Sequence, residues 1–380
     1  MTTAANHLIT AQPGSLVILP VVLDSKIWIL VISEGGLITR YETNIDRLTL
    51  GKTVLDLRKL LESPTSDLKT LQATSQQLYN WLIRPIEPQL KASKTPPKLI
   101  FALDRVTRYL PMGVLHDGQQ YLIQRYPIST ILSLESTDTQ PSQFNNISNT
   151  KVLALGASQG SGNYRALPAV KPELASIVQN TGIYPGQILL DRDFTRSNFK
   201  NLIKQDIKIL HIATHGKFDP TKIKGSVLLL GNGEELPIDD IETFNFTALD
   251  LVVLSACQTA LGNAEQEGIE IPGISSYFLS KGAKSVIASL WSVDDASTAI
   301  LMQHLYRHLS EGKSKTEALQ LAQLALLNIK DTPSQTQAIK SLPRFKGLED
   351  TELKTTKHPI APGYTHPYYW APFILIGNSR

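Results

Sequence analysis

The chain has 380 residues, of which 42% are hydrophobic and 19% charged, a composition typical of globular proteins and unlike that of disordered chains. Its net charge of +3 comes from mixed signs, so nothing suggests nucleic acid or an anionic membrane as a partner. The most apolar stretch is too short to span a bilayer, and the N-terminus lacks the pattern of a signal peptide. The single cysteine excludes internal disulfides and favours a reducing, cytoplasmic location.

The first part of the chain predicts a small α/β half. Residues 1–14 are polar and predict a disordered tail, whereas 15–133 alternate apolar runs with helical patterns. A hairpin turn is expected at 116–118, and the polar stretch 134–150 predicts a linker. The strands of this half are expected at Leu16–Leu23, Ile27–Ser33, Leu37–Glu42 and Lys98–Leu103, and its helices near 52–62 and 66–83.

The second part, 151–380, predicts a larger α/β domain in which apolar strands alternate with helices. Strands that are apolar along their whole length are covered on both faces, which indicates a mostly parallel sheet between helix layers. Residues 331–365 carry four prolines and scattered charge and predict a surface insertion. The strands are expected at Val152–Leu155, Ile188–Leu190, Ile207–Ala213, Val227–Leu230, Leu251–Ser255, Ser285–Leu290 and Phe373–Ile376, and the helices near 171–180, 195–204, 269–281, 294–310 and 313–329.

Two of these strands lead directly to side chains that could react. The run 207–213 is followed by His215, and the run 251–255 is followed by Cys257. The carboxyl ends of strands line the ligand crevice of a parallel sheet, so neighbouring strands would bring imidazole and thiol together. An imidazole that takes the thiol proton leaves a strong nucleophile. The pattern therefore predicts a catalytic dyad.

Gly216 adds to this interpretation because a residue without a side chain lets its backbone N–H approach a reacting carbonyl. With the N–H of Cys257 it could form an oxyanion hole. The competing interpretation is structural, since free cysteines are commonly buried and pack as small apolar groups. His211, which lies within the strand, is interpreted as a hydrogen-bonded core residue and not as a second base.

Four segments, ILHIATHGKF, LVVLSACQTALG, GAKSVIASLWSVDDAST and HPYYWAPFILIGN, resemble the successive motifs of CHAT domains. These relatives of caspases, separases and gingipains are often fused to tetratricopeptide repeats in bacteria. The resemblance extends from about Pro111 to the end of the chain. It implies a caspase-like fold and a bacterial cysteine endopeptidase that acts on a protein substrate without cofactor or metal. It also implies that His215 and Cys257 are the catalytic dyad, and that 15–133 is a degenerate copy of the same fold.

The resemblance also bears on specificity. Caspases carry a glutamine two residues before the cysteine, but Ser255 stands there, so a preference for aspartate is not supported. The segment 291–295, WSVDD, resembles a separase motif whose aspartate pairs with an arginine of the substrate. This similarity implies that Asp295, with Asp294 beside it, forms a pocket for a basic residue. The alternative is helix capping, because both acids stand at the start of a predicted helix.

Other functions remain open from the sequence. A catalytically silent interaction or signalling module with this fold is the second hypothesis, and another thiol hydrolase or acyl transferase is the third. Retention of both dyad residues favours the peptidase. Relatives are often latent, which implies a regulatory protein or upstream repeat domain as partner and 331–365 as a responsive element.

Two weaker patterns carry no catalytic prediction. The glycine-containing stretch 156–162 fits no phosphate-binding pattern and predicts a flexible loop beside the cleft. His304 and His308 stand four residues apart on a predicted helix, as zinc ligands can. No third ligand is evident in the sequence, so they are expected on the surface.

Overall fold

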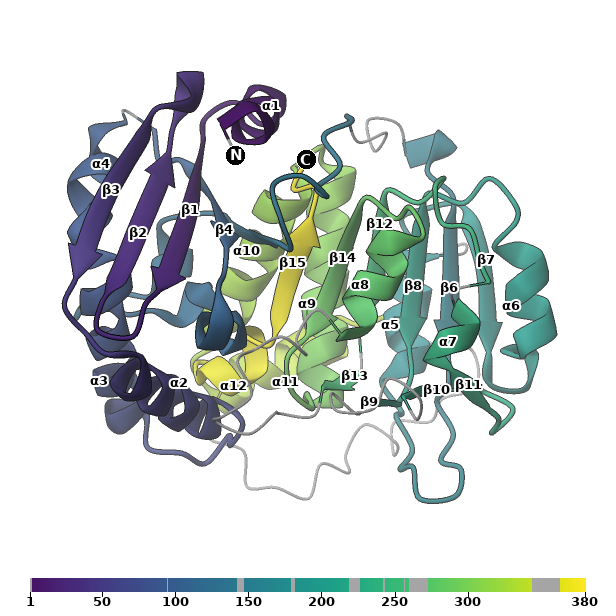
Figure 1. Cartoon of the computed structure of the whole chain (residues 1–380). Coiled ribbons are helices and arrows are strands. Elements are labelled where there is room, and N and C mark those ends of the chain that lie inside the picture. The colour runs from purple at the N-terminus through teal and green to yellow at the C-terminus, as the bar shows by residue number, and fades with distance from the viewer. Residues whose placement is uncertain are drawn as a thin grey trace.

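The computed structural model describes residues 2–93, 95–141, 147–178, 182–218, 226–241, 243–255, 257–259 (backbone), 273–343 and 363–380. Within this part of the chain, one eleven-stranded mixed sheet extends through the whole molecule (Figure 1). From edge to edge its strands are β3 (Ile38–Thr43), β2 (Ile27–Ile32), β1 (Ser15–Val22), β4 (Lys98–Ala102), β5 (Ile128–Ile131), β15 (Phe373–Gly377), β14 (Ser285–Ser289), β12 (Leu251–Leu254), β8 (Ile209–Ala213), β6 (Val152–Gly156) and β7 (Gly186–Leu190).

The two predicted halves share this sheet and do not form separate ones. Strands β14, β12, β8, β6 and β7 are mutually parallel, and β15 runs antiparallel to β14. Strand β15 also pairs with β5 of the first half, with Ile376 opposite Thr130. The predicted sheet between helix layers is confirmed. Strand β5 was not predicted, because four residues with only two buried carry little periodic signal.

Alternating side chains divide the core into layers on the two faces of the sheet. In β6, Val152 and Ala154 point into one hydrophobic cluster, whereas Leu153 and Leu155 point into another. Figure 1 shows α9 and α10 behind the sheet and α7 and α8 in front of it. The helices are α1 (Thr2–Ala11), α2 (Arg47–Leu61), α3 (Leu68–Leu82), α4 (Glu87–Ala92), α5 (Val170–Ile177), α6 (Arg196–Leu202), α7 (Ile238–Ile241), α8 (Gly273–Ser280), α9 (Asp295–Ser310), α10 (Lys315–Leu327), α11 (Thr332–Lys340) and α12 (Pro367–Trp370).

The predicted disordered tail at 1–14 is wrong, because residues 2–11 form helix α1. Ala5, Leu8 and Ile9 recur at helical spacing and are buried in a cluster with Val17 of β1 and Ile100 of β4. Burial of this apolar stripe stabilises the helix, and Ala4 packs partly buried against the same cluster. The N-terminal segment is therefore part of the core.

The predicted insertion at 331–365 contains a helix in its described part. Asp331 caps α11 by accepting a hydrogen bond from the backbone N–H of Ser334 (2.8 Å). Pro333 stands in the first turn, where its missing N–H costs nothing, so here proline begins a helix. Residues 344–362 lie outside the described residues. No described helix is long and apolar enough to cross a membrane.

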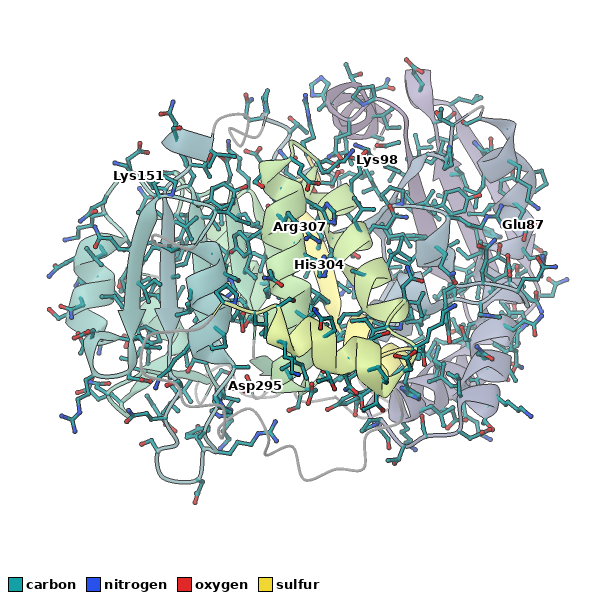
Figure 2. The ribbon with its side chains drawn as sticks, turned by 180° about the vertical axis from the view of Figure 1, so that it is seen from behind. Glu87, Lys98, Lys151, Asp295, His304 and Arg307 are labelled. Carbon is teal, nitrogen blue, oxygen red and sulfur yellow. The ribbon has the colours of Figure 1, made fainter. Side chains whose placement is uncertain are left out.

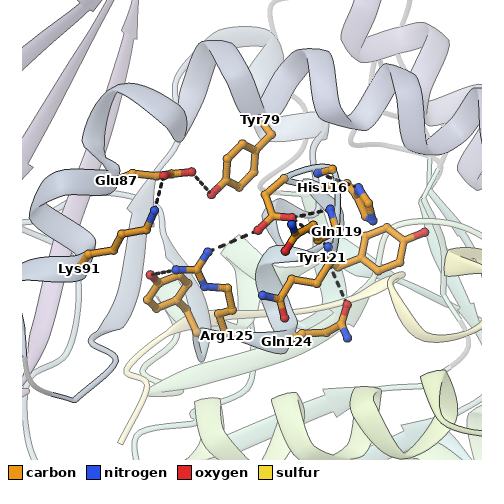
Figure 3. A network of polar contacts seen from close by, with 12 residues as sticks. Tyr79, Glu87, Lys91, His116, Gln119, Tyr121, Gln124 and Arg125 are labelled. Atoms are coloured by element: carbon orange, nitrogen blue, oxygen red, sulfur yellow. Dashed lines mark hydrogen bonds and ion pairs between the residues drawn. The ribbon is translucent and has the colours of Figure 1, made fainter.

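A polar network fixes the turn predicted at 116–118 (Figure 3). The carboxylate of Asp117 accepts hydrogen bonds from the backbone N–H groups of Gln119 (2.8 Å) and Gln120 (2.9 Å). It also pairs with the guanidinium of Arg125 at 3.4 Å. Gly118 has a φ of +107°, which side chains rarely allow. The hairpin turn is confirmed.

Candidate active site

The two strands that lead to the dyad candidates are neighbours. Strand β8 pairs in parallel with β12, and every residue of both strands is buried. Parallel strands carry their following residues to the same edge of the sheet, so the segments after β8 and β12 emerge together. Figure 1 shows this edge at the lower end of the sheet, where the small strands β9 (Gly216–Phe218) and β13 (Cys257–Thr259) lie.

Strands β9 and β13 place the backbones of the dyad segments side by side. They pair in parallel, with Cys257 opposite Gly216, the residue that follows His215. Adjacent strands are about 4.8 Å apart, so this register brings the backbone of Cys257 next to that of the His215–Gly216 dipeptide. The side chain of Cys257 lies outside the described part of the chain. The two other strands of this small sheet are β10 (Val227–Leu229) and β11 (Glu235–Pro237).

The imidazole of His215 is oriented by a backbone carbonyl. Its Nε2 lies 2.7 Å from the carbonyl oxygen of Arg165, and its ring packs against that of Tyr164 with 5.4 Å between centroids. A carbonyl oxygen can only accept, so Nε2 carries the hydrogen and Nδ1 of the neutral ring keeps its lone pair. Burial lowers the pKa of His215 below 6.5, against the opposing effect of the Arg165 carbonyl, so the ring is neutral at pH 7.

Hydrogen bonds at Ser158 fix the loop that carries Arg165. The carboxylate of Asp191 accepts hydrogen bonds from the backbone N–H (2.7 Å) and hydroxyl (2.8 Å) of Ser158. Asp191 itself has a φ of +52°, a conformation that non-glycine residues rarely adopt. The hydroxyl of Tyr164 donates to Glu235 at 3.0 Å. The stretch 156–162, predicted to be a flexible loop, is therefore held by contacts to Asp191, and the cleft lining includes Arg165 and Leu167 but no residue of this stretch.

A small cleft, open to solvent, lies beside His215. Its lining includes Arg165, Glu173, Ser255 and Asp295. Ser255 is buried, and its hydroxyl has no hydrogen-bond partner among the described residues. The cleft therefore gathers two acids, one base and one cation around a small hydroxyl side chain.

The sequence leaves two roles open for both Asp294 and Asp295, lining the substrate pocket or capping the helix that follows. In the structure the two residues take different roles. Asp294 caps α9, since its carboxylate accepts a hydrogen bond from the backbone N–H of Ser297 (2.9 Å). Asp295 instead lines the cleft, where its carboxylate accepts from the backbone N–H of Ala169 (2.7 Å). Burial raises the pKa of Asp295 to about 7, and the charges of Glu173 and Asp294 add to this rise.

His211 is a hydrogen-bonded core residue, as predicted. It is fully buried, with Nε2 2.9 Å from Glu173 and Nδ1 3.1 Å from the hydroxyl of Tyr306. The sequence does not point to Glu173, which lies on α5, 38 residues before its partner. It does not point to Arg165 either, because any residue type can supply a backbone carbonyl.

The two histidines of α9 lie on the outer helix layer. Figure 2, seen from behind, shows His304 with Arg307 on this layer and Asp295 at its lower end. His308 donates to the carboxylate of Glu311 at 2.8 Å. The described residues include no group of three His, Cys, Asp or Glu side chains that could hold a metal ion.

One buried cation links the first half to the segment that ends in Asp295. Arg58 of α2 is 2% exposed, donates to the carbonyl of Leu290 (2.8 Å) and stacks 4.8 Å from the ring centroid of Trp291. The indole N–H of Trp291 in turn donates to the carbonyl of Tyr368 (3.2 Å). Burial lowers the pKa of Arg58 to about 10, so it remains charged at neutral pH. Arg58 thus fixes the start of segment 290–295.

Replacing Arg58 with alanine is expected to lower the free energy of unfolding by about 3 kcal/mol, because it leaves a cavity and removes the stacking on Trp291. Methionine should return most of this stability, since it refills the volume without burying a charge. It cannot donate to Leu290, so amide hydrogen exchange within 290–295 should stay faster than in the wild type. Unchanged exchange in the methionine variant would show that Arg58 only fills space.

A single mixed sheet between helix layers, with histidine and cysteine segments side by side at one edge, defines a caspase-like fold. The chain belongs to the CHAT domain family, whose family model matches residues 72–378. The resemblance seen in the sequence is thereby confirmed. A search of curated proteins gave no match.

Solved structures agree on the fold. Two structures of the Saccharomyces cerevisiae separase–securin complex match 99% of this chain with TM-scores of 0.58 and 0.59, each at 10% identity. The chain covers only 31% and 30% of those chains, so the likeness concerns one part of a longer protein. The Arg-specific cysteine proteinase gingipain R matches 87% of this chain and 75% of its own, with a TM-score of 0.45 and 9% identity.

Proposed function

We propose that this protein is a cysteine endopeptidase that hydrolyses peptide bonds of a protein substrate, with Cys257 as nucleophile and His215 as base. The observation that carries the proposal is the parallel register of Cys257 against Gly216, beside an imidazole whose Nδ1 has no hydrogen-bond partner among the described residues. Thiolate and imidazole supply both the nucleophile and the proton transfer, so the reaction needs no cofactor. We place it in the bacterial cytoplasm.

The reaction follows from these roles. Nδ1 of His215 takes the thiol proton, and the thiolate attacks the scissile carbonyl carbon. The backbone N–H groups of Gly216 and Cys257 donate to the resulting oxyanion, and such a donor contributes about 3–4 kcal/mol in other hydrolases. The C–N bond breaks as the imidazolium protonates the leaving amine, which leaves a thioester. Water, deprotonated by His215, then hydrolyses the thioester and restores the thiol.

The carbonyl of Arg165 acts as a positioning group in this scheme. It holds Nε2–H and thereby leaves Nδ1 as the ring nitrogen that can accept the thiol proton. When the imidazolium forms, the carbonyl dipole stabilises its positive charge without itself changing protonation, as a buried carboxylate does in serine proteases.

The side chains of the cleft favour a substrate that has a basic residue immediately before the scissile peptide bond. Asp295 offers a carboxylate to a guanidinium or ammonium group, and Ser255 leaves room where a larger side chain would fill the cleft. Asp294 contributes by capping α9 and so fixing the position of its neighbour. Partners other than the substrate would be a regulatory protein or a repeat domain that switches a latent enzyme on.

The test combines turnover with chemical labelling. A fluorogenic peptide library should be cleaved after arginine or lysine. A peptidyl electrophile ending in arginine should attach once per chain, and because the chain has one cysteine, the attachment site is unambiguous. His215→Ala should slow labelling strongly. Absence of both cleavage and labelling faster than that of a free thiol would contradict the proposal for this chain and favour the silent interaction module.

A further inference from the structure

A buried chain of polar side chains lies behind the cleft. Glu173 of α5, His211 of β8 and Tyr306 of α9 are each at most 1% exposed. His211 bridges the other two, at 2.9 Å from the carboxylate of Glu173 and 3.1 Å from the hydroxyl of Tyr306. Three separate elements thus converge on one carboxylate, and that carboxylate lines the same cleft as Asp295.

The proton positions in this chain follow from its hydrogen bonds. The hydroxyl of Tyr306 makes no other hydrogen bond within the described part of the chain, so it donates to Nδ1 of His211. Nε2 then carries the hydrogen and donates to Glu173. Burial and the charge of Glu173 hold the pKa of Tyr306 well above 10, so the hydroxyl remains a donor.

Acidic groups outnumber cations around Glu173 and Asp295, so the cleft is negatively charged. Asp294 adds a third carboxylate at the start of α9, and the loop contributes the cation Arg165, whose side chain is exposed. His215 at the end of β8 is neutral at pH 7 because burial lowers its pKa. Glu173 and Asp295 therefore face a cleft in which the cation Arg165 lies at the exposed rim.

We propose that Glu173 is a second specificity-determining acid of this cleft, which binds the guanidinium or ammonium group of a basic residue together with Asp295. His211 and Tyr306 are positioning residues that hold the carboxylate of Glu173 in place. The inference rests on the proposed function for its substrate, a basic residue of a protein. Binding of the cation itself requires neither the thiol nor turnover.

This arrangement couples cation binding to proton release. Burial raises the pKa of Asp295 to about 7, and repulsion from the charge of Glu173 adds to this rise. A bound cation favours the state in which both carboxylates are charged. The proton on Asp295 must then leave to solvent, so binding should strengthen as the pH rises from 5 to 8.

The test uses benzamidine as a guanidinium-like probe and the Cys257→Ala chain as the binding protein. Titration calorimetry in two buffers of different ionisation enthalpy gives both the affinity and the number of protons released. The parent should bind benzamidine and release up to one proton near pH 7. Glu173→Gln, which keeps the hydrogen bond from His211 but removes the charge, should bind at least about tenfold more weakly and release fewer protons.

Two further variants make the result decisive. Glu34→Gln removes the charge of an exposed acid outside the cleft and should leave affinity unchanged. Tyr306→Phe removes the hydrogen bond that orients His211 toward Glu173, so affinity should fall even if Glu173→Gln proves unstable. A folded Glu173→Gln chain that binds benzamidine like the parent would overturn the inference, as would no binding by the parent. Neither outcome depends on whether the wild type cleaves peptides.

Discussion

Replacing Cys257 with alanine is expected to lower kcat/KM for peptide hydrolysis by at least about 10⁴-fold while the protein remains folded. The thiolate forms the covalent intermediate, and no hydroxyl or amine in the proposed scheme can take its place. Residual turnover would come only from substrate binding and the oxyanion donors. The measurement is the initial rate on the best library peptide, with wild type and variant at equal concentration.

His215→Ala is the matched test of the base. It should cause a loss of similar size, and the double variant should lose little more, because the two residues act as a unit. Thermal unfolding of all three variants checks that the fold is intact. A Cys257→Ala chain that retains wild-type rates would exclude the proposed nucleophile, whatever the His215 variant does.

Asp295→Asn is expected to weaken cleavage after arginine or lysine by about 10²-fold or more, while raising the free energy of unfolding at pH 8 by on the order of 2 kcal/mol. The pKa of Asp295 is about 7 in the folded protein, against an ordinary value near 3.8. Between these values the folded state binds a proton that the unfolded state has lost. Wild-type stability therefore falls as the pH rises from 4 to 7, and asparagine removes this fall.

Urea unfolding at pH 4.5 and pH 8 measures the effect, and the gain should appear mainly at pH 8. Asp46→Asn is the control, since Asp46 is an exposed cap of α2 whose hydrogen bonds from Thr49 lower its pKa. That variant should gain no stability at pH 8. If Asp295→Asn is stabilised equally at both pH values, the carboxylate is not protonated in the folded state.

Much of the site could be predicted from the sequence because it lies where apolar strands end. The runs before His215 and Cys257 are continuous and apolar, so their burial, their parallel pairing and the fold class follow from pattern alone. The four segments that resemble CHAT motifs also indicate in which order these strands follow one another along the chain. The sequence does not reveal which groups from distant parts of the chain contact the site.

Arg165 and Glu173 illustrate why. Arg165 acts through its carbonyl, a group that every residue carries, across 50 residues of chain. Glu173 is one acid among many until α5 packs beside β8. The helix at the N-terminus was missed for a related reason, since its three buried residues are few and the surface they cover belongs to β1 and β4. Only tertiary packing distinguishes such residues from ordinary surface ones.

The place of β15 has a consequence for how the protein is made. Of the eleven strands it is the last to be synthesised, yet it lies in the middle of the sheet, between β5 and β14. Until it leaves the ribosome, the strands on either side have no neighbour to join them, and their inner edges stay open. A translation product that stops short of β15 would leave β5 and β14 without the strand that joins them. The two halves can therefore form one continuous sheet only after the chain has been translated through β15.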